Sequence, residues 1–391
     1  MERASKRFVK PVEAECDVCD GVKVLVVGCG FVAQHLMKAF LGADRYEVSF
    51  THRGSEAPFL LPEGLKALGD VDVRDGASCA RALWMSLPDV VVNAAAVSSP
   101  KNCESDPEEA MATNCPMGLL EAMFAVVPDA LFIQFSTDIV NGDRGLSSPL
   151  YADGGDRLER IQRVLEDTKP ENVYGKSKLA FEKRLFDSWP RCVLFRCSNV
   201  IGPKAPFSYD KEDNKKFGAW LFEALSTEQE VHLWYDEIRS FVWISQIVDG
   251  VVSAIDKFAI AHVPADSAAR VEALAAATKK PTETAFYDKD ARRTYPPVFL
   301  HLNAGGPEAL SRVHVGRAIA ETITDHHASI NAIPRSTLPY PSPLDVAMDS
   351  SNFQNILQVP LLSIRDALQQ QNPFSAAPAP RLFAAEEEQK D

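Results

Sequence analysis

Long apolar runs are missing from this sequence, and so is an excess of positive charge. No stretch approaches the roughly 20 apolar residues that a membrane-spanning helix needs. The first 21 residues carry basic side chains but no apolar core of the kind found in a signal peptide. The formal net charge of −13 argues against nucleic acid or an anionic membrane as the main partner. We therefore expect a cytoplasmic protein that acts on neither.

The sequence also lacks an ordered pattern of cysteine or histidine ligands. Its eight cysteines are scattered and do not form the dense framework of a disulfide-rich domain. Cys16 and Cys19 make one C-x-x-C pair, but no second pair or nearby histidine follows at zinc-binding spacing. His326 and His327 have no ligand-spaced partners either. The sequence therefore predicts no metal site.

What the sequence does contain is an alternation of short apolar runs and helical patterns. Continuous apolar runs are typical of parallel strands buried on both faces, and the helices between them indicate right-handed crossovers. We expect an α/β fold with a doubly wound parallel sheet, the Rossmann fold. The predicted strands are 22–28, 46–54, 69–75, 88–96, 130–138 and 191–202, and the predicted helices are 31–42, 76–86, 105–126 and 171–188.

After residue 202 the alternation loosens, although a strand and a helix return within 298–323. We expect a flexible segment at 1–21 and a dinucleotide-binding Rossmann domain at 22–202. A smaller C-terminal substrate lobe is predicted at 203–368, with a surface insertion at 259–296. Residues 369–391 lack periodicity and are predicted to be a disordered tail.

A glycine-rich turn follows the first predicted strand. Gly28, Gly30 and Ala33 form a G-x-G-x-x-A pattern between that strand and a helix. The first glycine permits a tight turn, the second lets a pyrophosphate approach the backbone, and the small third residue allows close packing. Amides at the start of the helix, around Phe31 and Val32, would hold the phosphates. The alternative is a tight turn in some other doubly wound protein.

The end of the second predicted strand bears on which dinucleotide is bound. Thr51, His52 and Arg53 stand where an acidic residue would bind the ribose hydroxyls of NAD. Because an arginine is available there for a 2′-phosphate, NADP(H) is favoured and NAD(H) stays possible. A solvated turn residue is the alternative for Arg53. Asp72 and Val73, after the third strand, are candidates to hold the adenine amino group.

A second group of polar residues ends the fifth predicted strand. Ser136, Thr137 and Asp138 lie there, and the carboxyl ends of parallel strands border the ligand crevice. Tyr174 and Lys178 follow, one helical turn apart. A phenol transfers protons near neutral pH only where a cation and hydrogen bonds favour its phenolate, and Lys178 can supply that charge. Tyr174 and Lys178 alone fit an ordinary helix better, but with Thr137 and the glycine turn they predict a proton-transfer site beside a nicotinamide.

The order of these motifs resembles the extended short-chain dehydrogenase/reductase superfamily over about residues 22 to 255. The segments PDVVVNAAAVSSP, FSTDIV, NVYGKSKLAFEK and RCSNVIGP are most similar to the dTDP-4-dehydrorhamnose reductase branch. That branch also includes the β regulatory subunit of methionine adenosyltransferase. The resemblance implies that Thr137, Tyr174 and Lys178 are catalytic, with Tyr174 protonating the substrate oxygen as hydride arrives and Lys178 binding the nicotinamide ribose.

The same resemblance implies roles for two asparagines. Asn114 would help a proton relay, and Asn93, Ala94 and Ala95 would lie along the cofactor. Two residues of the glycine turn depart from the superfamily's fuller motif, because Val27 stands at its first glycine and Ala33 at its last.

Further residues bear on the substrate. Ile139 stands where sugar-nucleotide dehydratases of the superfamily carry a glutamate, which argues against dehydration. The segment DEIRSFVW resembles the part of the substrate lobe where relatives place an arginine against a nucleotide diphosphate, so Arg239 is the candidate there. The alternative is an ion pair of Arg239 with Asp236 or Glu237. Ser136 and Asp138 are also candidates for substrate contact.

Two functions of different classes follow from these residues. The first is an NADPH-dependent reductase of a keto group, best matched by a 4-keto-6-deoxy sugar attached to a nucleotide. The second is an NADP-binding regulatory subunit that contacts a partner enzyme such as methionine adenosyltransferase. An epimerase of the same fold is disfavoured, because epimerases of the superfamily tend to carry a small residue at the position of Asp138.

Overall fold

The computed structural model describes the chain in six stretches, which are 21–142, 157–207, 216–227, 229–259, 298–323 and 329–371. Several expectations fall outside them. They are the N-terminal segment with Cys16 and Cys19, the insertion after residue 259, the pair His326 and His327, and the tail beyond residue 371.

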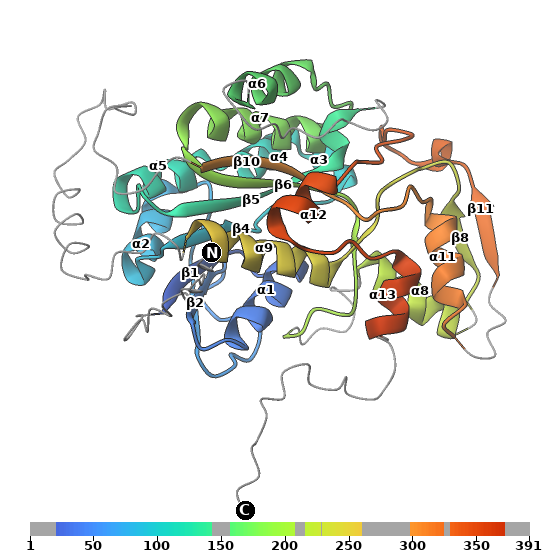
Figure 1. The fold of residues 1–391 in the computed structure, drawn as a ribbon, viewed down its shortest axis with the longest axis horizontal. Helices are drawn as coiled ribbons and strands as arrows, with labels where there is room; N and C mark the ends of the chain where they lie inside the picture. The colour runs from blue at the N-terminus through green and yellow to red at the C-terminus, as the bar shows by residue number, and fades with distance from the viewer. Residues whose placement is uncertain are drawn as a thin grey trace, which may run out of the picture.

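A seven-stranded sheet of parallel strands forms the centre of the molecule (Figure 1), as the alternation of apolar runs predicts. Its strand order is β10-β6-β5-β4-β1-β2-β3. The strands are β1 (Val22–Val27), β2 (Tyr46–Thr51), β3 (Leu65–Leu68), β4 (Val90–Asn93), β5 (Leu131–Thr137), β6 (Arg191–Cys197) and β10 (Val298–Ala304). The order reverses at β1, so the carboxyl ends of β1 and β4 lie side by side and open a crevice for a ligand.

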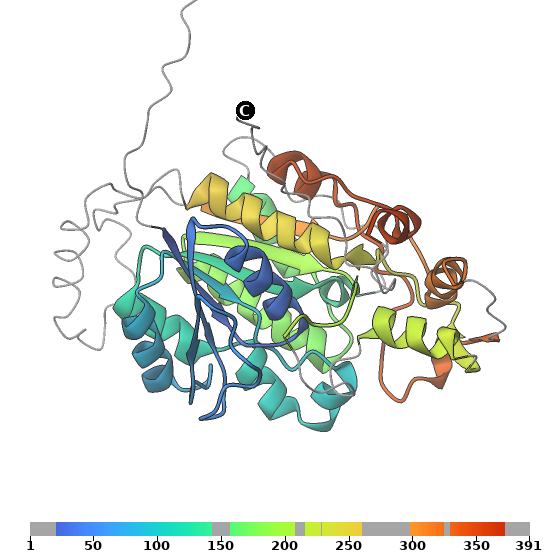
Figure 2. The ribbon, with the colours of Figure 1, turned by 90° about the horizontal axis from the view of Figure 1, so that it is seen from below.

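Helices cover both faces of the sheet because its strands are apolar on both sides (Figure 2). The first core cluster lies between the sheet and helices α1 (Phe31–Leu41) and α9 (Ile244–Phe258). The second lies under α2 (Gly76–Ser86), α5 (Met117–Val126) and α7 (Val173–Ser188). Further helices on the chain are α3 (Pro100–Ser105), α4 (Pro107–Asn114), α6 (Arg157–Asp167) and α12 (Ser351–Leu357), with 3-10 turns η1 (Asp138–Asn141) and η3 (Arg335–Thr337).

A smaller group of elements lies at one side of the sheet, on the right in Figure 1. Strand β8 (Val231–Trp234) pairs in parallel with β11 (Ile330–Ile333). Helices α8 (Phe217–Ser226), α11 (Arg312–Ala320) and α13 (Ile364–Gln371) complete the group. A short pair, β7 (Val200–Ile201) with β9 (Val242–Trp243), connects it to the sheet.

The structure corrects four sequence predictions. The third strand is β3 at 65–68 and not 69–75, where the chain turns at Asp70 with φ of 55°. The predicted helix 105–126 is divided into α3, α4 and α5, and Pro107 and Pro116 stand at the two breaks because proline cannot continue a helix.

The other two corrections concern the C-terminal half. Strand β10 pairs with β6, so part of the range 203–368 belongs to the large sheet and not to a separate lobe. Helix α13 continues to Gln371, two residues beyond the predicted start of the tail at 369.

Candidate active site

The glycine turn lies between β1 and α1 at the reversal point of the sheet. Gly28 has a φ of 97°, and a Cβ there would lie 3.1 Å from the Ala95 nitrogen, so only glycine fits. A Cβ on Gly30 would meet nothing within 4 Å, which leaves open space above the turn. No side chain caps α1, and its first turn holds no acidic residue. The turn therefore offers free backbone amides to a phosphate, which is what a bound dinucleotide needs.

A cavity of about 400 Å³ begins at this turn and continues along the carboxyl ends of β4, β5 and β6. Its size is in the range of ordinary ligand sites. Most of the predicted site residues line it together, namely Gly30, Phe31, Val32, Asn93, Ala94, Ser136, Thr137, Asp138, Tyr174, Lys178 and Arg239. Residues that are distant in sequence are thus brought to one place.

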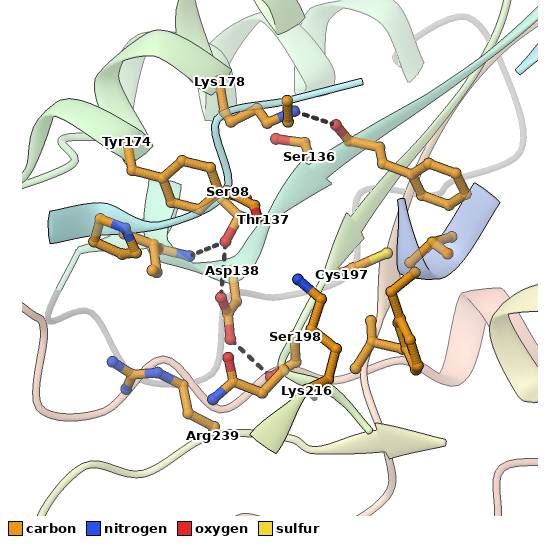
Figure 3. A pocket seen from close by; sticks show the side chains of 18 of the residues that line it. Ser98, Ser136, Thr137, Asp138, Tyr174, Lys178, Cys197, Ser198, Lys216 and Arg239 are labelled. Carbon is orange, nitrogen blue, oxygen red and sulfur yellow. Dashed lines mark hydrogen bonds between the residues drawn. The ribbon is translucent and has the colours of Figure 1, made fainter. Parts of the chain in front are cut away.

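Tyr174 and Lys178 project from α7 into this cavity (Figure 3). Asn172 caps the helix by accepting a hydrogen bond from the Gly175 nitrogen at 2.8 Å, which fixes the turn that carries Tyr174. Burial lowers the pKa of Lys178 to about 8, and its Nζ donates to the Phe135 carbonyl at 3.1 Å. Burial also raises the pKa of the Tyr174 phenol well above its ordinary value. Tyr174 is therefore a protonated donor near neutral pH, while the Lys178 ammonium is directed at the backbone and not at the phenol.

Thr137 and Asp138 lie below Tyr174 and form a chain of hydroxyl and carboxyl groups (Figure 3). Thr137 lines the cavity together with Tyr174. Thr137 Oγ1 donates to Asp138 Oδ1 at 3.1 Å, and Ser198 Oγ donates to Asp138 Oδ2 at 2.7 Å. Each hydroxyl in the chain can accept one proton and donate another.

Ser136 lines the cavity, but its hydroxyl donates to Glu182, a carboxylate that the sequence reasoning missed. Glu182 is buried, and its carboxylate accepts hydrogen bonds from Arg196 Nη2 at 2.6 Å and Nε at 3.1 Å. Glu182 follows Lys178 by four residues and Tyr174 by eight, so this spacing on α7 was the available signal. The pair joins α7 to β6 directly beneath the cavity.

Asn114 does not line the cavity. Its amide nitrogen donates to the Val97 carbonyl at 3.1 Å and to Ser177 Oγ at 3.0 Å, while its oxygen accepts from the Val97 nitrogen at 2.9 Å. These contacts fasten the segment after β4 to α7. The structure therefore gives Asn114 a place beside the site, in contact with the helix that carries Tyr174.

Arg239 lines the cavity, but its guanidinium is already hydrogen bonded to other residues of the protein. Nη2 donates to Glu237 Oε1 at 3.1 Å, to Ser342 Oγ at 3.1 Å and to the Pro343 carbonyl at 2.9 Å. Arg239 is only 2% exposed. An ion pair was the alternative interpretation of this arginine, and the structure shows that pair with Glu237.

Besides Gly28, four predicted cofactor residues are absent from the cavity lining. Arg53 is half exposed and lies 3.4 Å from a carboxylate oxygen of Glu109. Asp72 accepts both a side-chain and a backbone hydrogen bond from Arg74, so its carboxylate is occupied. Val73 is buried in the second core cluster, and Ala95 packs against Gly28.

Two cations of the cavity wall were missed from the sequence. The Lys216 side chain extends from the start of α8 toward Asp138 and Cys197 (Figure 3). Arg312 stacks between the rings of Phe217 and Trp234, at 4.6 and 4.8 Å from their centroids. The only signal for Arg312 in the sequence was the helix start at Ser311. The two aromatic rings that hold its side chain come from distant segments, so no local pattern reveals the contact.

Among the residues that the structure describes, no group of three or more His, Cys, Asp or Glu side chains is placed to hold a metal ion. None of the described helices is long and apolar enough to cross a membrane.

Comparisons with known proteins agree with this architecture. Residues 24–264 match the NAD dependent epimerase/dehydratase family. Among curated proteins, dTDP-4-dehydrorhamnose reductase of Salmonella typhimurium is 36% identical over 117 residues, which are 30% of this chain and 35% of that protein. The chain spans between about a third and about a half of the length of the first curated relatives it matches.

Solved structures resemble the fold over most of the chain. UDP-glucose 4-epimerase of Thermotoga maritima with UDP-glucose has a TM-score of 0.62 at 17% identity, covering 88% of this chain and 96% of its own. dTDP-4-dehydrorhamnose reductase of Bacillus anthracis in complex with NADP has a TM-score of 0.60 at 13% identity, covering 89% and 98%. These likenesses confirm the predicted fold class.

Proposed function

The chain belongs to the NAD dependent epimerase/dehydratase family, and within it we propose an NADPH-dependent reductase of a keto group. The substrate that we propose is a 4-keto-6-deoxy sugar attached to a nucleotide. The extended short-chain dehydrogenase/reductase resemblance noted in the sequence agrees with this family. The observation that carries the proposal is the Tyr174 phenol, which burial keeps protonated and which shares one cavity with Thr137, Lys178 and the glycine turn.

The dinucleotide would be held by the chain's own backbone and polar groups. Amides of α1 beyond Gly30 would bind the phosphates, and Asn93 and Ala94 would lie along the ring system. Arg53 is half exposed after β2 and pairs with Glu109 at the surface, and no carboxylate occupies residues 51 to 53, so its guanidinium would turn to a 2′-phosphate there. A bound reduced nicotinamide would supply a hydride to the carbonyl carbon.

The protein's side chains would complete the reduction. Tyr174 would give its phenolic proton to the substrate oxygen, since burial keeps the phenol protonated until that oxygen becomes basic. Thr137 would orient the carbonyl, and Lys178 would bind the nicotinamide ribose. Ile139, next to Asp138, supplies no base for elimination, which favours reduction over dehydration.

The test is consumption of NADPH by the purified protein supplied with dTDP-4-dehydrorhamnose, with Tyr174→Phe assayed in parallel. A proton donor in the transition state contributes roughly 10²- to 10⁴-fold to rate, so the variant is expected to lose at least 100-fold in kcat. Its affinity for NADPH is expected to stay within about twofold, because the lost hydroxyl faces the substrate.

Two results would contradict the proposal. Equal turnover by Tyr174→Phe would remove the proton donor from the account. Tight NADPH binding with no turnover of any nucleotide-linked ketone, together with co-purification of methionine adenosyltransferase, would favour the regulatory subunit instead.

A further inference from the structure

Two arginines and two carboxylates form a cluster beyond the carboxyl ends of β2 and β3. Arg53 follows β2, Asp72 and Arg74 follow β3, and Glu109 lies in the first turn of α4. Ion pairs join the four side chains, which we call the Glu109 cluster. Glu109 comes 56 residues after Arg53, so no local sequence pattern contains this contact.

Glu109 is the centre of this cluster, because its two carboxylate oxygens pair with different arginines. Oε1 lies 3.4 Å from Arg53 Nη2 and accepts a hydrogen bond from Thr113 Oγ1 at 3.0 Å. Thr113 Oγ1 also accepts a hydrogen bond from Arg53 Nη2 at 3.3 Å. Oε2 accepts a hydrogen bond from Arg74 Nη1. One carboxylate therefore holds both guanidinium groups.

The cluster lies where the adenosine half of a dinucleotide would be bound. Val27 and Thr51 are neighbours at the ends of β1 and β2, and the Gly28 nitrogen donates to Thr51 Oγ1 at 3.1 Å. Arg53 follows Thr51 by two residues, close to the glycine turn. In Rossmann folds, a carboxylate at this strand end binds the 2′-hydroxyl of NAD, and an arginine accommodates the 2′-phosphate of NADP. The Glu109 cluster contains both kinds of group.

The charges of the Glu109 cluster are balanced without a ligand. Two guanidinium groups pair with two carboxylates, and the side chains are only partly exposed, from 28% for Glu109 to 56% for Arg53. Because each arginine already has a carboxylate partner, a 2′-phosphate gains their charge fully only if they leave Glu109. A ribose with free hydroxyls brings no charge and can donate a hydrogen bond to Glu109 while the ion pairs stay intact.

We propose that Glu109 sets the preference between NADPH and NADH by competing with the 2′-phosphate for Arg53 and Arg74. This inference rests on the dinucleotide binding of the proposed reductase. With NADPH, Arg53 Nη2 and Arg74 Nη1 change partner from Glu109 to the phosphate, while Arg74 Nε stays on Asp72. With NADH, Glu109 keeps both arginines. The preference for NADPH is therefore smaller than the two arginines alone would produce.

The test measures the dissociation constants of NADPH and NADH by fluorescence titration, without turnover. Glu109→Gln keeps the size of the side chain and removes its charge. NADPH is expected to bind about tenfold more tightly to this variant, because two partly exposed pairs no longer compete for the arginines. NADH should bind within about twofold of wild type, or more weakly, because its ribose hydroxyl loses a charged acceptor.

Glu108→Gln is the matched control, since Glu108 is exposed in the same turn of α4 and the substitution changes the net charge equally. Both dissociation constants should stay within about twofold in this variant, because solvent screens a charge that lies outside the cluster. An unchanged ratio of the two constants in Glu109→Gln overturns the proposal. An equal gain for NADPH in Glu108→Gln overturns it as well.

A triple variant tests whether Glu109 acts through the arginines. In a chain that already carries Arg53→Ala and Arg74→Met, Glu109→Gln has no arginine to release, so its gain for NADPH should fall to about twofold or less. A full gain in that chain overturns the competition. A shifted ratio without turnover counts only against the reductase function, whereas turnover with an unshifted ratio counts only against the role of Glu109.

Discussion

On the α7 side of the cavity, at the top of Figure 3, Lys178 carries its charge toward a backbone carbonyl and has no ion-pair partner among the described residues. On the other side, Glu237 holds both Arg239 and Arg312. Burial alone would raise the pKa of Glu237, but the two arginines outweigh it and hold that pKa below its ordinary value. On the first side, which we call the α7 wall, the Lys178 ammonium has no carboxylate partner in the described part of the chain and can bind a ligand. On the second side, the arginine wall, Glu237 compensates both arginines, and Arg312 is partly exposed to the cavity.

Glu237→Gln is the largest perturbation, because it leaves the buried charge of Arg239 without its counter-ion. Breaking a buried pair from one side costs about 3–5 kcal/mol of unfolding free energy, measured by urea denaturation. Glu321→Gln is the matched control, since its pair with Arg365 is more than half exposed and screened by solvent, so a much smaller loss is expected. Equal losses of unfolding free energy in the two variants would contradict the prediction, because the buried pair of the arginine wall would then stabilise the protein no more than an exposed pair.

Lys178→Met should increase the stability of the protein, whereas Glu237→Gln should decrease it. The ammonium is buried with a pKa of about 8, well below its ordinary value of 10.5, so folding works against its charge. We expect a gain of about 1–3 kcal/mol at pH 7, after allowing for the lost bond to Phe135. Lys176→Met, an exposed position on the same helix, should change stability by less than about 0.5 kcal/mol.

The same lysine makes this gain depend on pH. Below pH 8 both folded and unfolded chains carry the proton, and the full cost of burying the charge is present. Between about pH 8 and 10.5 the folded protein releases the proton while the unfolded chain keeps it, so wild type gains stability relative to Lys178→Met. Urea denaturation of both proteins from pH 7 to 10 measures the narrowing gap. A gap that stays constant would mean that Lys178 is not desolvated.

Arg312→Met tests whether the arginine wall faces the substrate. Arg312 is partly exposed to the cavity, and Glu237 keeps Arg239 after it is removed. We expect KM for the nucleotide sugar to rise about tenfold, or about 1.4 kcal/mol, with the Kd of NADPH unchanged. Arg317→Met, on the exposed face of the same helix, is the control. A rise in the Kd of NADPH instead would mean that the dinucleotide, and not the sugar, lies against the arginine wall, which contradicts the account.

Arg53→Ala has the smallest expected effect and sharpens the assignment of the cofactor. Loss of one half-exposed contact to a 2′-phosphate should weaken NADPH binding by about fivefold to tenfold and leave NADH within twofold. Arg45→Ala removes a comparable half-exposed arginine that pairs with Asp256. Fluorescence titration with both dinucleotides measures the ratio, and equal losses for NADPH and NADH would remove the basis for preferring NADP.

The two walls also differ in how well the sequence predicts them. Tyr174, Lys178 and Thr137 belong to local patterns whose spacing is visible in the chain, and the α7 wall follows from strand and helix order. The arginine wall joins Glu237, Arg312 and Ser342 across about 100 residues, so no local pattern contains it.

The errors in predicting strands and helices of the Rossmann half also arise because tertiary contacts override local patterns. Val71 and Val73 alternate with polar residues as in a strand, but they are buried from a loop that turns at Asp70. The amphipathic helix α6 was missed. Pairing of β10 with β6 is a contact between distant segments, which periodicity does not reveal.

The most direct measurement of the central claim follows a deuterium label from C4 of the reduced nicotinamide. Wild type would be incubated with deuterated NADPH and dTDP-4-dehydrorhamnose, and the sugar product examined by mass spectrometry and NMR. The account predicts one deuterium at the reduced carbon, with transfer at least 100-fold slower in Tyr174→Phe. A bound cofactor whose label never reaches any nucleotide-linked ketone would contradict it.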